Sequence, residues 1–266
     1  MNLVKFPGLN LEFNVQQIAF NIFGIDVYMY ALIIVTGIVV SYFIATKSKE
    51  KFDNNIDDIL EVGIISLIVG IIGARLYYVL FNLEYYIESP LRILNLRDGG
   101  LGIYGGIILG LITAYIVCKK KKMDVINVFD FVIPYLALSQ SIGRWGNFFN
   151  VEAYGSVTDS ILRMGINTVN GYMEVHPTFL YESVCTLIIF FILRNIQKNR
   201  KFKGEVFILY LMSYSFIRFF IEGLRQDSLM IFNFRISQIL SLLIFVISLI
   251  ILIFKFKNIK KEDKIN

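Results

Sequence analysis

The stretch that decides the fold runs from residue 233 to residue 254 and reads NFRISQILSLLIFVISLIILIF. A membrane's hydrocarbon core of about 30 Å is crossed by roughly 20 mostly apolar residues in a helix. Similar stretches lie at residues 27–46, 58–81, 100–118, 126–145, 177–196 and 204–223. The sequence therefore predicts an all-α integral membrane protein, a bundle of about seven transmembrane helices that forms a single polytopic membrane domain over residues 1–266.

The composition agrees with this architecture. Of the 266 residues 56% are hydrophobic, and the mean hydropathy is +0.64, whereas soluble domains contain about 45–50% apolar residues. These values exclude a large soluble domain. The segment from residue 146 to residue 176 is too long for a simple turn, so we expect a small extracytoplasmic cap there, with a little strand structure.

Lysine and arginine clusters indicate how the chain is oriented in the bilayer. Loops that follow odd-numbered spans lie on one side of the membrane, and basic loops favour the cytoplasm. The sequence thus predicts the N-terminus outside the cell and the C-terminus inside. The clusters follow the first, third, fifth and seventh spans and are Lys47/Lys49/Lys51, Lys119 to Lys122, Arg194 to Lys203 and Lys255 to Lys264.

The other basic residues are mostly arginines in the spans or on the predicted outer side. Of 26 basic residues 17 lie in the clusters, and eight of the remaining nine are arginines. Charges inside a membrane are costly and indicate functional sites, and a planar guanidinium suits bidentate binding of phosphate. One interpretation is a lipid phosphate as ligand, and the other is pairing with Glu61, Glu152 or Glu222. The eight are Arg75, Arg92, Arg97, Arg144, Arg163, Arg218, Arg225 and Arg235.

Residues 143–155 read GRWGNFFNVEAYG and lie at the outer end of the fourth span. Arg144 and Asn147 are three residues apart, so they share one face of a helix as a cation and an amide donor. The glycines around them let the backbone approach a ligand closely. Together these residues predict a phosphate-binding site.

A second group lies in the sixth span, where Tyr214, Arg218, Glu222 and Arg225 follow one another at spacings of four, four and three. This spacing places all of them on one stripe, which we expect to face the bundle interior. An Arg218–Glu222–Arg225 ladder that neutralises itself is one interpretation. The positive charge that remains favours an anionic ligand.

Two further segments carry polar residues. The third span begins with a glycine-rich run from Gly99 to Gly106, which predicts close helix packing, while Tyr104 within it offers a hydroxyl donor for an oxyanion. His176 is the single histidine and precedes Pro177 at the start of the fifth span, where capping the helix is favoured over general-base catalysis. The sequence shows no zinc motif and no phosphate-binding P-loop.

These motifs together make the sequence resemble the bacterial prolipoprotein diacylglyceryl transferases over almost the whole chain. The resemblance implies transfer of the diacylglyceryl group from phosphatidylglycerol to the lipobox cysteine of prolipoproteins, at the outer face of the plasma membrane, with release of glycerol phosphate. It implies no metal, no organic cofactor and no nucleic-acid partner. The matching motifs are residues 143–155, His176-Pro-x-x-Leu-Tyr-Glu182, Arg218-x-x-x-Glu222-x-x-Arg225, Gly73-x-Arg75-x-x-Tyr78, and Gly99-Gly100 with Tyr104-Gly105-Gly106.

The resemblance also assigns roles to the matched positions. The residues that it implies, or leaves as candidates, for catalysis are Arg144, Arg218, Asn147, Tyr30 and Tyr104. Those expected to bind phosphatidylglycerol are Arg144, Asn147, Glu152, Gly155, Tyr214, Arg218, Glu222, Arg225, Gly99, Gly105 and His176. Some members carry a histidine, proposed as a base, where this chain has Tyr104. A histidine base is therefore excluded there, and we favour catalysis that mainly stabilises the leaving phosphate.

Two other classes of function fit part of the sequence. A transporter or channel for an anionic solute also uses inward-facing arginines and glycine-broken helices, but the odd number of spans and the lack of an internal repeat count against many transporter designs. A lipid-binding scaffold would explain why arginines in the spans bind a lipid phosphate. It would not explain the tyrosine, asparagine and glutamate residues beside them.

Overall fold

The structure is a computed structural model that describes residues 2–48, 52, 55–95, 99–169, 171–227, 230–232 and 234–262. Arg97 and three of the clustered basic residues, Lys49, Lys51 and Lys264, lie outside the described residues. The chain divides into two compact units: a larger unit of Met1–Glu50 and Asp130–Asn266, and a smaller unit of Lys51–Phe129. The expected single membrane domain stays a prediction.

Seven helices in the described parts of the chain are long and apolar enough to cross a membrane. This finding confirms the predicted all-α membrane protein, because each predicted span overlaps one of these helices. The orientation of the termini stays a prediction. The spanning helices are α1 (Met29–Thr46), α2 (Ile56–Leu80), α4 (Ile103–Lys120), α5 (Val125–Gly143) continued by α6 (Trp145–Asn150), α7 (Thr178–Lys198), α8 (Glu205–Leu224) and α9 (Ile236–Glu262).

The fourth span continues five residues beyond its expected end at residue 145, to Asn150. Pro134 lies inside α5 without ending it. Arg144 lies between α5 and α6 with helical backbone angles, φ −61° and ψ −25°, so the chain keeps its direction there. Val151 then adopts a left-handed conformation with φ 53°, which is rare for a β-branched residue and ends the helix.

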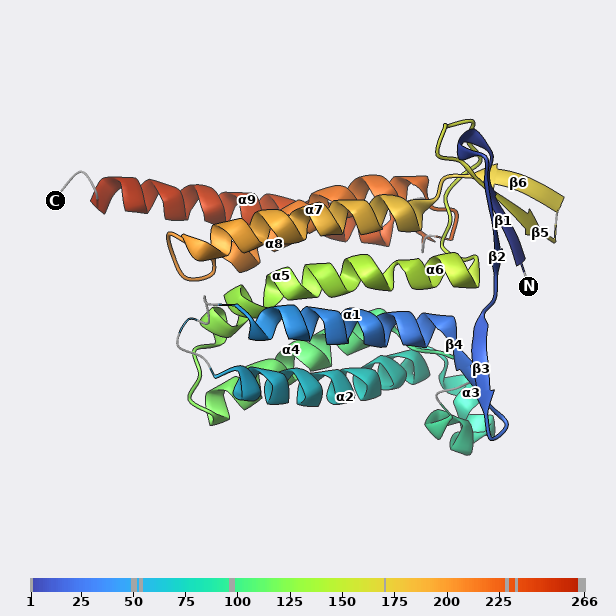
Figure 1. Cartoon of the computed structure of the whole chain (residues 1–266). Coiled ribbons are helices and arrows are strands. Elements are labelled where there is room, and N and C mark those ends of the chain that lie inside the picture. Colours follow the sequence, from blue (N-terminus) through green and yellow to red (C-terminus); the bar gives the residue numbers. More distant parts are fainter. Residues whose placement is uncertain are drawn as a thin grey trace. The chain divides into compact units, whose positions relative to one another are not determined.

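Strands in the larger unit build a small cap at one end of α6 and α7 (Figure 1). Four of them form an antiparallel sheet in the order β2-β1-β5-β6, with Lys5 of β1 opposite Gly165 of β5. The sequence predicted strand structure only within residues 146–176, and the N-terminal strands were missed. The sheet strands are β1 (Asn2–Phe6), β2 (Leu11–Val15), β5 (Met164–Thr168) and β6 (Gly171–Val175), with the turn η1 (Pro7–Leu9) between the first two.

A hydrophobic core joins the sheet of the cap to α6 and α7. Val4 and Ile166 of the sheet are fully buried, and Phe148 of α6 and Phe179 of α7 pack into the same cluster. The remaining strands form two hairpins, β3 (Ile18–Ile22) with β4 (Ile25–Tyr28) and β7 (Met230–Ile231) with β8 (Phe234–Arg235). The long-range partner β5 explains only part of the omission of the N-terminal strands, because β1 also pairs with β2, and β3 with β4, in local hairpins.

The smaller unit packs α2 against α4 through glycines, with α3 (Leu83–Glu88) and η2 (Pro90–Leu94) following α2. A Cβ added to Gly73 would lie 2.7 Å from the Gly105 carbonyl oxygen, and one added to Gly70 would lie 3.2 Å from that of Gly106. Small residues at these positions allow the two backbones to approach closely. The packing interpretation of the glycine-rich run therefore holds for Gly105 and Gly106.

Candidate active site

The first half of the site lies where α5 meets α6. Arg144 Nη1 lies 3.5 Å from Asn147 Oδ1, as expected for two residues on one helical face. The Asn147 amide nitrogen donates to Glu152 Oε1 at 2.9 Å, and that of Asn150 donates to the same oxygen at 3.2 Å. These bonds hold Glu152, which follows α6, against the last turn of that helix. The left-handed backbone at Val151 turns the chain so that Glu152 can reach it.

Glu182, near the start of α7, joins the two halves of the site. Its carboxylate oxygens lie 2.5 Å from Arg144 Nη2 and 3.2 Å from Arg218 Nη1. The Tyr214 hydroxyl donates to Glu182 Oε1 at 2.8 Å. Only 2% of the Glu182 side chain is exposed. One buried carboxylate thus binds both arginines that the sequence selected, although they lie 74 residues apart in the chain.

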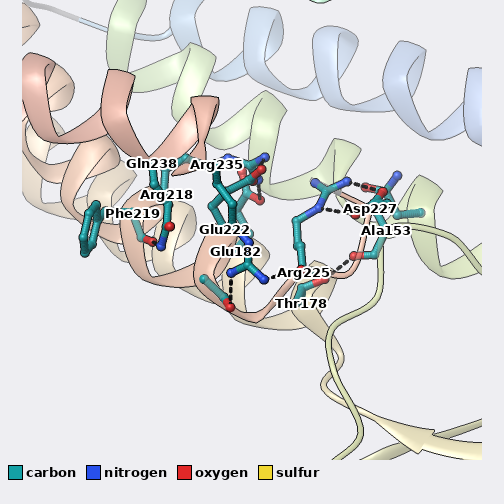
Figure 2. Close-up of polar contacts among 12 residues, drawn as sticks. Ala153, Thr178, Glu182, Arg218, Phe219, Glu222, Arg225, Asp227, Arg235 and Gln238 are labelled. Atoms are coloured by element: carbon teal, nitrogen blue, oxygen red, sulfur yellow. Dashed lines mark hydrogen bonds and ion pairs between the residues drawn. The ribbon is translucent and has the colours of Figure 1, made fainter. Parts of the chain in front are cut away.

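Glu222 completes the group, which we call the arginine–glutamate cluster: Arg144, Glu182, Tyr214, Arg218 and Glu222. Arg218 Nη2 forms an ion pair with Glu222 one helical turn further along α8, and Figure 2 shows Arg218 close to both carboxylates. Arg144 and Arg218 remain partly accessible, with 23% and 17% of their side chains exposed. Both guanidinium groups are therefore paired with carboxylates but remain accessible from outside the protein.

The positive charge that we expected to remain on the stripe of the sixth span is balanced by carboxylates from outside the stripe, because Glu182 pairs with Arg218 and Asp227 pairs with Arg225. Glu182 was named in a matching motif but was given no role, because it belongs to a different span from Arg218, and hydropathy and spacing within one helix cannot show such a partner. Its position near the start of a span, where a carboxylate is costly, was the available signal. The cluster is a balanced set of two arginines and two glutamates.

Arg225 does not continue the stripe on α8, because the helix ends at Leu224 and Arg225 has extended backbone angles. Its guanidinium binds Asp227 through two hydrogen bonds of 2.9 and 2.7 Å, as Figure 2 shows. This pairing lowers the pKa of Asp227 and raises the pKa of Arg225. Arg235 donates to the carbonyl oxygens of Gly223 and Arg225 and so satisfies the end of α8.

Gly155 and His176 bring three segments together beside the cluster. The Gly155 amide donates to the His176 carbonyl at 2.9 Å, and Gly155 also pairs with Arg225 in an isolated bridge. A Cβ at Gly155 would lie 2.7 Å from the His176 Cβ, so glycine is required for this approach. His176 Nδ1 lies 3.1 Å from the Tyr181 hydroxyl. The N-cap residue of α7, Pro177, has no side-chain cap, and the His176 carbonyl accepts from the amide of Thr178, the first residue of α7, at 2.9 Å, so a capping role for His176 stays a prediction.

Tyr30 lies in the first turn of α1 and packs against the segment of residues 143–155. A Cβ added to Gly146 would lie 2.6 Å from the Tyr30 ring, so this glycine makes room for the tyrosine. Gly146 directly precedes Asn147. The structure therefore places Tyr30 beside the part of the site that Arg144 and Asn147 form.

Three predicted site residues belong to the smaller unit and are described within it. Tyr104 is half-buried, with its ring centroid 6.3 Å from that of Tyr77, and Gly105 packs against Gly73. Gly99 has φ 77° and accepts a hydrogen bond of 2.6 Å from Arg75 Nη1. The catalytic role of Tyr104 and the binding roles of Gly99 and Gly105 stay predictions.

The guanidinium of Arg75, in the smaller unit, binds only backbone carbonyl groups of the segment that follows α2 among its described hydrogen bonds. It is buried and donates to five carbonyl oxygens at once, which fixes the chain between η2 and α4. These carbonyls belong to Arg92, Ile93, Asn95, Gly99 and Gly100. Across the described ranges, no group of three or more histidine, cysteine, aspartate or glutamate residues is arranged to hold a metal ion.

The fold and the site together define a multi-pass membrane protein with a buried cluster of arginines and glutamates at the cap end of its larger unit. The chain belongs to the prolipoprotein diacylglyceryl transferase family, whose model matches residues 17–254. This match confirms the resemblance that the sequence motifs indicated.

Named relatives agree with this assignment. The chain is 43% identical over 250 residues to the phosphatidylglycerol–prolipoprotein diacylglyceryl transferase of Finegoldia magna, covering 94% of this chain and 99% of that protein. It is 44% identical over 228 residues to the protein of the same name from Clostridioides difficile, covering 86% and 90%. For that of Staphylococcus aureus strain MSSA476 the identity is 40% over 257 residues, covering 93% and 92%.

Proposed function

We propose that this protein transfers the diacylglyceryl group of phosphatidylglycerol to the thiol of the lipobox cysteine of prolipoproteins, forming a thioether and releasing glycerol phosphate. Family membership and the names of the relatives support the reaction and its two substrates. The observation that carries the proposal is Glu182, because its carboxylate holds Arg144 and Arg218 together in a buried site. A phosphate is an anion that can take the same place.

The reaction is a displacement at a glycerol carbon. The cysteine sulfur forms a bond to this carbon, the carbon–oxygen bond to the phosphate breaks, and the oxygen leaves with the bonding electrons. Negative charge therefore moves from the thiolate to the departing phosphate. Two guanidinium groups held in a partly buried site stabilise that charge, and each offers five N–H donors in a planar arrangement that matches phosphate oxygens.

The other site residues position the arginines and the lipid. Asn147 and Glu152 link the end of α6 to the segment after it, and Tyr214 shares Glu182 with the arginines. Tyr30 supports Gly146 from the first turn of α1. In the proposal the lipid contacts Arg144, Arg218 and Asn147 directly, and Tyr104, Gly99 and Gly105 of the smaller unit retain the roles assigned above.

The proposed location is the bacterial plasma membrane, with the active site on the extracytoplasmic side. The cluster lies at the cap end of the larger unit, whereas α1 and α9 run towards their basic C-terminal ends on the opposite side (Figure 1). Basic residues favour the cytoplasmic side. This arrangement supports a site that is open to the outer leaflet, where secreted precursors arrive.

The test is a lipidation assay with purified protein, phosphatidylglycerol labelled in its acyl chains and a peptide that contains a lipobox cysteine. Arg144→Ala and Arg218→Ala are compared with Arg163→Ala, whose arginine pairs with Glu174 on the cap. We expect label on the peptide with the wild type and the control, and about a 100-fold to 1,000-fold loss for each cluster variant. Folded wild-type protein that transfers no label would overturn the proposal.

A further inference from the structure

The β3–β4 hairpin has one apolar face and one polar face. Phe20 pairs with Val27 and Ile22 pairs with Ile25, so these four side chains share one face of the two-stranded sheet. On the other face, the Asn21 amide donates to Asp26 Oδ1 at 2.7 Å. Phe20, Ile22 and Ile25 are each exposed by 44–48%, although the polar face is the one suited to water.

The hairpin turn places an aromatic ring where a small polar residue is usually found. Phe23 and Gly24 are the two turn residues, with φ of 51° and 81°. A two-residue turn with both φ values positive strongly favours asparagine or aspartate before the glycine, and a bulky residue in this conformation is rare. Phe23 is nevertheless 100% exposed, so its ring is not packed against any other part of the described chain.

The hairpin is continuous with a membrane span. Strand β4 ends at Tyr28 and α1 begins at Met29, whose amide donates to the Gln17 carbonyl at the base of the hairpin. Figure 1 shows β3 running across the end of α1 at a steep angle to the helix axis. A hairpin that leaves a membrane-crossing helix in this way runs along the membrane surface.

We propose that the β3–β4 hairpin is a membrane-interface anchor: its apolar face and Phe23 insert into the boundary of headgroups and acyl chains on the cap side, while Asn21 and Asp26 face water. Aromatic residues favour this boundary, and an element with one apolar and one polar face is suited to lie in it. The occupant is the lipid leaflet, because the hairpin continues directly into a helix that this leaflet surrounds.

The anchor has a consequence for the neighbouring site. The Gln17 side chain donates to the Asn150 carbonyl at the end of α6, at 3.2 Å. Docking of the hairpin on the leaflet would therefore set the depth of α6 and of the first turn of α1, which carries Tyr30.

The test measures the depth of single spin labels in liposomes of phosphatidylglycerol and phosphatidylethanolamine. Labels are introduced by Phe20→Cys, Phe23→Cys, Asn21→Cys and Asp26→Cys in a background in which Cys118 and Cys185 are serines. Val169→Cys is the matched control, because Val169 is an equally exposed apolar residue in the turn between β5 and β6. Collisions with oxygen report the membrane, and collisions with a water-soluble nickel complex report water.

We expect labels at residues 20 and 23 to favour oxygen at least several-fold more than those at residues 21, 26 and 169. The proposal would be overturned if the label at residue 23 collides with the nickel complex as often as the label at residue 169 does. Protection that disappears when the protein is diluted in excess lipid, or that requires the lipobox peptide, would overturn it too, in favour of a second copy or the precursor. In unmodified protein, a lipophilic carbene reagent should label residues 18–25 and spare residues 163–175.

Discussion

Two buried ionic networks in the described part of the larger unit differ in their bonding. In the first, Asp130 of α5 is 0% exposed and accepts from Arg200 at 2.8 Å and from the backbone amides of Gly204 and Phe207 at 2.7 and 2.9 Å. It thereby caps the start of α8 from another helix. In the arginine–glutamate cluster, the donors described for Glu182 are all side chains.

This difference separates a charge that holds the fold from a charge that can exchange partners. Backbone donors cannot leave Asp130 unless α8 itself moves, so the carboxylate is fixed with the helix. The guanidinium groups on Glu182 belong to partly exposed side chains, which can turn towards a phosphate without unfolding a helix. Burial and ion pairing are thus shared by both networks, and the source of the donors distinguishes them.

Asp130→Ala should give the largest effect, and it should be on stability. Removing one partner of a buried ion pair costs about 3–5 kcal/mol, and here the variant also removes the cap of α8. Thermal unfolding in detergent should show a clearly lowered midpoint, while the protein that remains folded transfers lipid at near the normal rate. A variant that is stable but inactive would contradict the distinction between the two networks.

Arg144→Lys should show the reverse pattern. Lysine keeps the positive charge but loses the planar, bidentate donor set, so we expect turnover to fall about 100-fold with a small change in unfolding temperature. Arg200→Lys is the matched control in the other network. If Arg144→Lys and Arg200→Lys change turnover equally, the arginines of the cluster exchange carboxylate for phosphate no more readily than Arg200 of the Asp130 network.

Ser183→Ala tests how the cluster is positioned. The Ser183 hydroxyl donates to the Ser141 carbonyl at 2.8 Å and accepts from Trp145 Nε1 at 3.1 Å, so it joins α5 to α7 beside Arg144 and Glu182. Each of these two hydrogen bonds contributes about 1 kcal/mol, so turnover should fall roughly five- to thirtyfold. Ser183→Thr should restore part of it.

The control for this effect is Ser215→Ala, because Ser215 is a buried serine that bonds to Met212 within its own helix. It should leave turnover unchanged. If Ser183→Ala and Ser215→Ala lower stability equally and neither alters turnover, Ser183 has only a structural role.

Tyr104→Phe should give the smallest effect, a partial loss of less than about tenfold. Loss of a general base usually costs about 100-fold to 10,000-fold, whereas loss of one hydrogen bond costs much less. Turnover is measured at saturating phosphatidylglycerol over a range of pH. Unchanged turnover would exclude the hydroxyl as an essential base, and a loss above 100-fold with an altered pH profile would assign it that role.

The sequence by itself determined the membrane spans and the family. Hydropathy finds the spans because the bilayer requires about 20 apolar residues wherever a helix crosses it, and this requirement acts on each segment separately. Local spacing was also enough to predict the contacts of Arg144 with Asn147 and of Arg218 with Glu222. The members of each pair are three or four residues apart on helical backbone, so they lie on the same face.

Only the tertiary structure decided which charges meet. It brought Glu182 between Arg144 and Arg218, turned Arg225 away to Asp227, and joined β1 to β5 across most of the chain. Such contacts depend on how separate helices and strands pack, and residue spacing carries no information about them. The spans follow from the solvent around each helix, whereas the site follows from the neighbours that each helix acquires in the folded protein.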